Sequence, residues 1–226
     1  MLGGRSEIKR GSQSVGIAVE ALHASLDELA RREPRFAAAL AHAGYPEPRQ
    51  SERGYVTLLR TIVGQQVSIK AAASMWTKLQ AAVGGVPDPA AILAASDEAL
   101  RGAGLSRQKS AYARSLAEEV LSGRLDLDNL AEGDEAAIAQ LVRVKGIGRW
   151  SAEIYLLFAE GRPDVWPAGD LAVQIALGRM LGLPEKPREQ TVRELSEPWR
   201  PHRGALAIFT WHHYKTPDPI AVAPRN

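Results

Sequence analysis

The stretch that decides the fold is LVRVKGIGRWSAEIYLLFAEGRPDVWPAGD, residues 141–170. Apolar residues at helical spacing stand on both sides of G-I-G at 146–148, which predicts two helices joined by a tight turn over about residues 134–160. Glycine permits such a turn and leaves backbone N–H groups uncovered. The first N–H groups of the second helix and its positive dipole end suit a phosphate, beside Lys145 and Arg149. An ordinary turn between helices would explain the glycines alone, so the interpretation depends on the residues after the second helix.

Asp170 comes after a connection rich in glycine and proline and precedes the apolar run LAVQIALGRML. An aspartate at this position is expected to cap a helix, because its carboxylate accepts from the unpaired N–H groups of the first turn. The same helix end favours the ionised carboxylate. Capping and catalysis do not exclude each other. The sequence therefore predicts a carboxylate that can face positive charge developing on a substrate.

Composition narrows the class of protein. The chain has 226 residues, of which 45% are hydrophobic, and these are sufficient for a core of one large or two small domains. It contains no cysteine, which excludes a disulfide framework and an iron–sulfur cluster held by this chain. No secretory signal and no apolar run of membrane-spanning length is present, so a soluble cytoplasmic protein without a membrane partner is expected. We also expect a monomer.

Charge is sorted along the chain although the net charge is only +2. Residues 51–115 contain eight Lys/Arg and four Asp/Glu, and residues 141–215 contain eleven and eight. Residues 116–140 contain only one Lys/Arg but seven Asp/Glu. This distribution favours one face that meets phosphate and another that faces solvent. Acidic residues that only cap and solvate helices would explain it nearly as well.

The coarse organisation is all-α. No segment alternates with a period of two, and the apolar spacing predicts about ten helices joined by short Gly/Pro/Ser turns. Residues 1–15 have the composition of a disordered tail. Residues 16–53 are expected to form N-terminal helices broken near Pro34. Ser96 and Ser106 are expected to cap helices, and Trp76, Trp166 and Trp199 to pack in the core.

Five stretches of the sequence resemble motifs of one protein family and occur in the same order along the chain. They are KGIGRWSA followed by PAGD, TIVGQQVSIKAA at 61–72, GLSRQKSAYA at 104–113 and PWRPHRGALA at 198–207. Together they resemble the helix–hairpin–helix/Gly-Pro-Asp superfamily of DNA base-excision glycosylases, and within it the DNA-3-methyladenine glycosylase II group of alkylation-repair enzymes. The resemblance covers roughly residues 54–214.

The resemblance implies a two-lobed helical fold with the active-site cleft between the lobes. Residues 54–165 would form one lobe, which contains the helix–hairpin–helix. The N-terminal helices at 16–53 would pack with residues 166–226 to complete the other lobe. Asp170 would then lie at the cleft.

The resemblance also implies roles for individual residues. Asp170 would be the catalytic carboxylate, and Gln66 would fill the gap that an extruded base leaves in the duplex. The base pocket would be lined by Trp150, Trp211, Ile154 and Leu171. DNA would be contacted by Gln65, Gln66, Lys145, Gly146, Gly148, Arg149, Ser151 and Arg203. The backbone carbonyls of Val142, Val144 and Ile147 would be free to hold a structural Na⁺ or K⁺, and no cofactor would be required.

The position of Trp150 carries one more implication. Relatives that also cut the strand through a Schiff base carry a nucleophilic lysine there, so tryptophan favours a monofunctional glycosylase. The expected function is the flipping and hydrolytic excision of alkylated purines, such as 3-methyladenine or 7-methylguanine, from double-stranded DNA. Two alternatives stay open at this point. They are a glycosylase for a deaminated or mismatched purine, and a non-catalytic helix–hairpin–helix DNA-binding protein.

Overall fold

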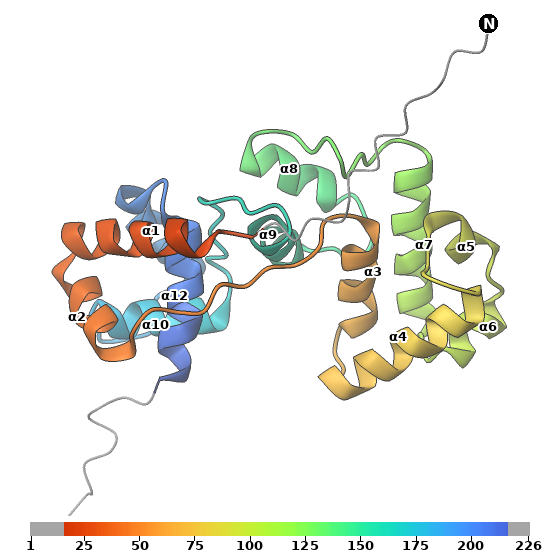
Figure 1. Cartoon of the computed structure of the whole chain (residues 1–226), viewed down its shortest axis with the longest axis horizontal. Helices are drawn as coiled ribbons and strands as arrows, with labels where there is room; N and C mark the ends of the chain where they lie inside the picture. Colours follow the sequence, from red (N-terminus) through yellow and green to blue (C-terminus); the bar gives the residue numbers. More distant parts are fainter. Residues whose placement is uncertain (1–15, 217–226) are drawn as a thin grey trace, which may run out of the picture.

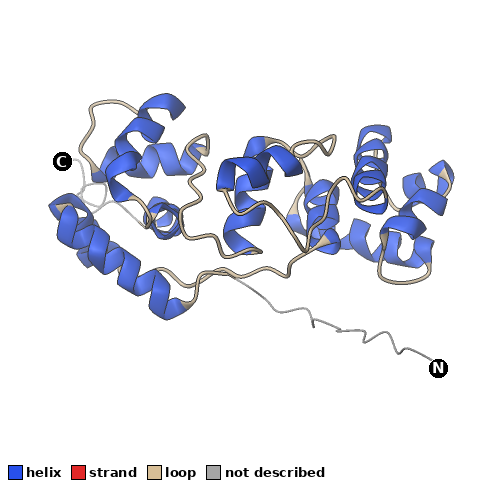
Figure 2. Ribbon diagram, turned by 90° about the horizontal axis from the view of Figure 1, so that it is seen from above, coloured by secondary structure: helices blue, strands red, loops and turns tan. Residues whose placement is uncertain are grey.

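The computed structural model describes residues 16–216, and the predicted tail at 1–15 lies outside them. The described part contains twelve α-helices, one 3₁₀ helix and no β-strand. Figure 2 shows this helical character by its colours. The all-α prediction is therefore confirmed. The number of helices exceeds the expected ten partly because two helices, α5 and α6, have only six residues each.

One group of helices combines both ends of the described chain and lies on the left of Figure 1. Its members that pack on one another are α1 (Val19–Arg32), α2 (Pro34–Ala43), α10 (Leu171–Met180) and α12 (Arg203–Lys215). Helix α11 (Glu189–Ser196) contacts α10 and continues directly into the 3₁₀ helix η1 (Glu197–Trp199). Pro34 begins α2, as its fixed φ and missing N–H favour.

A second group, on the right of Figure 1, is built from consecutive helices. Its members are α3 (Tyr55–Gly64), α4 (Ile69–Val83), α5 (Pro89–Ala94), α6 (Asp97–Gly102) and α7 (Arg107–Leu121). Side chains cap four of them: Ser68, Asp88, Ser96 and Ser106 accept from the first turns of α4, α5, α6 and α7. The caps predicted at Ser96 and Ser106 are confirmed.

Helices α8 (Asp134–Leu141) and α9 (Arg149–Phe158) pack against each other between the two groups. Helix α9 buries mostly apolar side chains, among them Tyr155, Leu156, Leu157 and Phe158. It also contacts α3, so the hairpin is fixed against the second group. This arrangement places the beginning of α9 near the junction of the two groups.

The core is continuous through the molecule and includes the three tryptophans predicted for it. Trp76, Trp166 and Trp199 are 8%, 4% and 7% exposed. Trp199 packs edge-on against Phe36 at a centroid distance of 4.8 Å, which joins η1 to α2. Across residues 16–216, no helix combines the length and the apolar character needed to span a bilayer.

Candidate active site

Asp170 is the N-cap of α10, as the sequence predicts. Its Oδ1 accepts from the backbone N–H of Val173 at 3.0 Å. The indole Nε1 of Trp211 donates to the same oxygen at 3.1 Å, and that of Trp150 donates to Oδ2 at 2.8 Å. An ionised carboxylate accepts about four hydrogen bonds. Three donors therefore fix its orientation and leave acceptor capacity on Oδ2.

The two indoles come from different parts of the fold. Trp150 is the second residue of α9, and Trp211 lies in the second half of α12. Phe158, at the other end of α9, packs against Trp211 with a centroid distance of 5.6 Å. The beginning of α10, one end of α9 and the inner face of α12 therefore meet at Asp170. This convergence of three helices makes the carboxylate a positioned group and more than a local cap.

The residues predicted for a base pocket differ in exposure. Trp150 is 50% exposed and Leu171 is 60% exposed, although both are large and apolar. Trp211 and Ile154 are half-buried and pack against the core. The exposed pair offers apolar surface beside the carboxylate, whereas Ile154 contributes mainly to packing.

Sequence reasoning missed the segment that connects α2 to α3. The Arg49 guanidinium lies 6.0 Å from the centroid of the Phe158 ring. Arg49 and Trp211 also line a small cavity of about 130 Å³, together with Pro46, Glu47, Ile208, His212 and Lys215. No motif marks Arg49, because a single arginine in a proline-containing connection has no distinctive spacing. The contact arises only from the way the segment crosses the molecule.

The turn between α8 and α9 has the geometry predicted from its glycines. Gly146 has φ +88°, a conformation that favours glycine, and an added Cβ would lie 2.1 Å from Cδ2 of Tyr112. The backbone N–H groups of Gly146, Gly148 and Ser151 have no acceptor among residues 16–216. The Lys145 side chain is exposed beside them. The turn therefore presents open donors and a cation, which together suit a phosphate.

The turn between α3 and α4 lies against this hairpin. Gln65 Nε2 donates to the carbonyl of Gly146 at 2.8 Å. This bond uses the Gln65 side chain to join the two turns, which is a different role from the predicted DNA contact. Gln66 is exposed and has φ +55°, which is uncommon for a residue other than glycine. Ile69, the first residue of α4, is 92% exposed, and the turn before it projects at the edge of the molecule (Figure 1).

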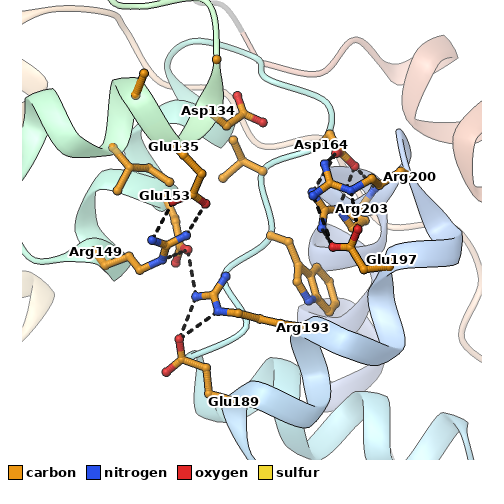
Figure 3. A pocket seen from close by; sticks show the side chains of 15 residues that line it. Asp134, Glu135, Arg149, Glu153, Asp164, Glu189, Arg193, Glu197, Arg200 and Arg203 are labelled. Atoms are coloured by element: carbon orange, nitrogen blue, oxygen red, sulfur yellow. Dashed lines mark hydrogen bonds and ion pairs between the residues drawn. The ribbon is translucent and has the colours of Figure 1, made fainter.

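Two arginines predicted to contact DNA are bound to carboxylates (Figure 3). Arg203 is 8% exposed; Asp164 accepts from its Nε and Nη2, and Glu197 from its Nη1. Arg149 donates to Glu135 and to Glu153, which lies four residues further along α9. The predicted DNA contacts of Arg203 and Arg149 would have to compete with these carboxylates, and they stay predictions. Their charges are already paired within the protein.

Both arginines line one charged cavity of about 760 Å³ between α8, α9, α11 and α12. Arg193 of α11 lies in it as well and donates to both Glu153 and Glu189, which connects α11 to α9. Glu153 is only 2% exposed, and its burial raises its pKa despite the two neighbouring guanidinium groups. The cavity lining is thus an ion-pair network that holds the hairpin to the first helix group.

The hairpin backbone bears directly on the predicted cation site. The carbonyl of Val144 accepts from the N–H of Ile147 at 3.0 Å. The carbonyls of Val142 and Ile147 accept no hydrogen bond from any described residue. Neutral carbonyl oxygens are ligands that hard cations accept. Two of the three predicted carbonyls, those of Val142 and Ile147, are therefore open, whereas that of Val144 is not free as expected, and the Na⁺ or K⁺ site stays a prediction.

The fold and these features define a helix–hairpin–helix protein in which an aspartate caps the helix that follows the hairpin. Comparison with known proteins agrees with this class. The chain belongs to the HhH-GPD superfamily of base excision DNA repair proteins, whose family model matches residues 59–201. It is 32% identical to DNA-3-methyladenine glycosylase 1 of Schizosaccharomyces pombe over 173 residues, covering 75% of this chain and 76% of that protein.

Two solved structures are similar over most of the chain. The DNA-3-methyladenine glycosidase of Bacillus halodurans has a TM-score of 0.75 at 31% identity, covering 85% of this chain and 89% of its own. The 3-methyladenine DNA glycosylase of Schizosaccharomyces pombe, solved in complex with abasic DNA, has a TM-score of 0.70 at 28% identity. That match covers 85% of this chain and 95% of the other. The resemblance seen in the sequence motifs is thus confirmed in sequence and in fold.

Proposed function

We propose that the protein is a monofunctional DNA glycosylase that flips alkylated purines out of double-stranded DNA and hydrolyses their N-glycosidic bond. The observation that carries the proposal is the Asp170 carboxylate. It is held by two indole N–H groups and a helix N-terminus. A binding module would have no use for an oriented carboxylate near negatively charged DNA. The names of the similar proteins support the alkylated-base substrate.

The geometry supports a division of labour between the hairpin and Asp170. A base within a duplex cannot be reached by an enzyme, so the backbone must be held while the nucleotide is rotated into the protein. Gly146, Gly148 and Ser151 supply open N–H donors for phosphate, and Lys145 supplies charge. A monovalent cation at the carbonyls of Val142 and Ile147 would add positive charge at the same turn.

Asp170 would act on the sugar and on water. As the bond between C1′ and the base nitrogen breaks, the sugar gains oxocarbenium character, which the carboxylate stabilises. Oδ2 has acceptor capacity left for a water molecule. The water oxygen attacks C1′, its proton passes to Asp170, and the base leaves with the bonding electrons. An N-alkylated purine carries a positive charge before the reaction and leaves as a neutral base, so it needs no strong general acid.

The aromatic surface would select the base. The indole faces of Trp150 and Trp211 are electron-rich and attract a cationic base more strongly than a neutral one. A strand-cleaving relative would need an amine nucleophile, and position 150 carries an indole instead. We therefore expect base release without strand cleavage.

The decisive experiment measures base release from methylated duplex DNA by the wild type and by Asp170→Asn. We expect the wild type to release 3-methyladenine or 7-methylguanine, with strand breaks only after alkali. Asp170→Asn keeps the acceptor oxygen of the cap but loses the charge. We expect it to bind DNA and to react at least about a hundredfold more slowly. Equal release by both proteins would contradict the role of Asp170. Release by neither, with intact binding, would favour a different lesion or a binding scaffold.

A further inference from the structure

Helix α7 contacts both of the turns that the sequence motifs assign to DNA binding, the turn at residues 65–68 and the hairpin turn. Lys109, Tyr112 and Ser115 are spaced three residues apart, which places them along one side of a helix. The first contacts the end of α3, and the other two contact the hairpin. The reaction at Asp170 makes no direct use of this side of α7.

The contact of Lys109 is at the end of α3. Its Nζ donates to the carbonyl of Val63 at 2.7 Å. The last carbonyls of a helix lack partners within the helix, and a cation there also complements the helix dipole. Partial burial lowers the pKa of Lys109. The ammonium group thus fixes the backbone only two residues before Gln65, where the projecting turn begins.

The other two residues fix the hairpin to the same helix. The ring of Tyr112 fills the space that a Cβ on Gly146 would occupy. Ser115 Oγ accepts from the backbone N–H of Lys145 at 3.1 Å. Because Gln65 also donates to the carbonyl of Gly146, the two turns are joined both directly and through α7. The position of the turn at residues 65–68 relative to the hairpin is therefore fixed by contacts that link α3, α7 and the hairpin to one another.

We propose that Lys109 is a positioning residue for base flipping, which holds the turn at residues 65–68 at a fixed height against the hairpin. This inference rests on the proposed function. The sequence motifs assign Gln66 in this turn to the gap that an extruded base leaves, so the turn would work against base stacking. If the backbone at the start of this turn can move, the turn separates the stacked nucleobases less effectively. The loss of Lys109 therefore slows extrusion of a stably paired nucleotide more than that of an unpaired one.

The test compares two duplexes in single-turnover excision. Each carries one 7-methylguanine, which is opposite cytosine in the first duplex and opposite an abasic-site analogue in the second. We expect Lys109→Met to lose about ten- to a hundredfold in rate on the paired lesion and less than about threefold on the unpaired lesion. Lys109→Arg keeps a charged donor and restores most of the rate. Lys78→Met removes an exposed charge from α4 and serves as the matched control.

The outcomes separate this role from others. An equal loss on both duplexes would indicate a phosphate contact or a general defect and would overturn the inference, as would an unchanged rate on the paired lesion. Thermal unfolding of each variant shows that the rates refer to folded protein. If the wild type releases no base from either duplex, the proposed function fails, and the inference fails with it. Wild-type activity with equal behaviour of Lys109→Met and Lys78→Met would overturn the inference alone.

Discussion

At the scale of single residues, the site depends on how one carboxylate is held. Asp170 was predictable, because aspartate is a preferred cap at the start of a helix and the hairpin stands close in the sequence. The two indole donors were assigned by resemblance to the base pocket, but their bonds to Asp170 were not predicted. They lie 20 and 41 residues away along the chain, and sequence spacing carries no information on such contacts.

Removing one indole donor tests whether the carboxylate needs its orientation. Trp150→Phe and Trp211→Phe each keep an aromatic face and lose one N–H on Asp170. Hydrogen bonds to charged groups contribute about 1.5–3 kcal/mol, so we expect a loss of about ten- to a hundredfold in the maximal single-turnover rate. The concentration that gives half of this maximal rate should change less. Trp166→Phe, which removes a buried indole bonded to the Val192 carbonyl, should lower stability without this loss of rate. Unchanged rates in both site variants would refute the orienting role.

At the scale of elements, the sequence predicts local features well and contacts between elements poorly. The turns at Gly64 and at 146–148 follow from glycine and apolar spacing, and the caps follow from residue type. The left-handed conformation of Gln66 and the bond from Lys109 to Val63 depend on packing between helices that are distant in sequence. The short charged helix at 189–196 was harder to predict, because few apolar residues define its face.

The two glycines of the hairpin should behave differently on substitution. Gly146→Ala places a Cβ at positive φ and against the Tyr112 ring, so we expect a loss of about 2–4 kcal/mol in the free energy of unfolding. Gly148 has φ −84° and no heavy atom within 4 Å of an added Cβ. Gly148→Ala should lose less than about 1 kcal/mol and weaken DNA binding through the methyl group on the phosphate-facing surface. Urea unfolding and DNA titration measure both effects. Equal destabilisation by the two changes would contradict this account of the turn.

At the scale of the whole molecule, the all-α architecture follows from composition and motif order, whereas the partners of the charged residues do not. Arg149 and Arg203 stand beside DNA-binding motifs in the sequence, yet both point into the ion-pair network behind the hairpin. A basic residue near a motif does not reveal which side of a helix it faces. In α9 the spacing of four between Arg149 and Glu153 was the available signal, because such residues share a face.

Arg203 provides the sharpest test of this distinction. The side chain of its partner Asp164 is only 15% exposed and also accepts from Arg200, whose own side chain is 53% exposed. Arg203→Met breaks the more buried pair. The negative charge of Asp164 is then balanced only by the half-exposed guanidinium of Arg200. We expect a loss of about 3–5 kcal/mol in the free energy of unfolding. Arg200→Gln removes a half-exposed guanidinium while Arg203 still compensates Asp164, and should lose less than about 1 kcal/mol.

DNA binding by Arg203→Met and by Lys145→Met distinguishes an arginine that braces the fold from a lysine that contacts phosphate. Removing a phosphate contact reduces the slope of log affinity against log salt by about one. We expect this reduction for Lys145→Met, because Lys145 is exposed beside the open N–H groups of the hairpin. Arg203→Met, measured at a temperature where it is folded, should keep the wild-type slope because its guanidinium is already bound to Asp164 and Glu197. A reduced slope with unchanged stability would show instead that Arg203 leaves its carboxylates to contact DNA.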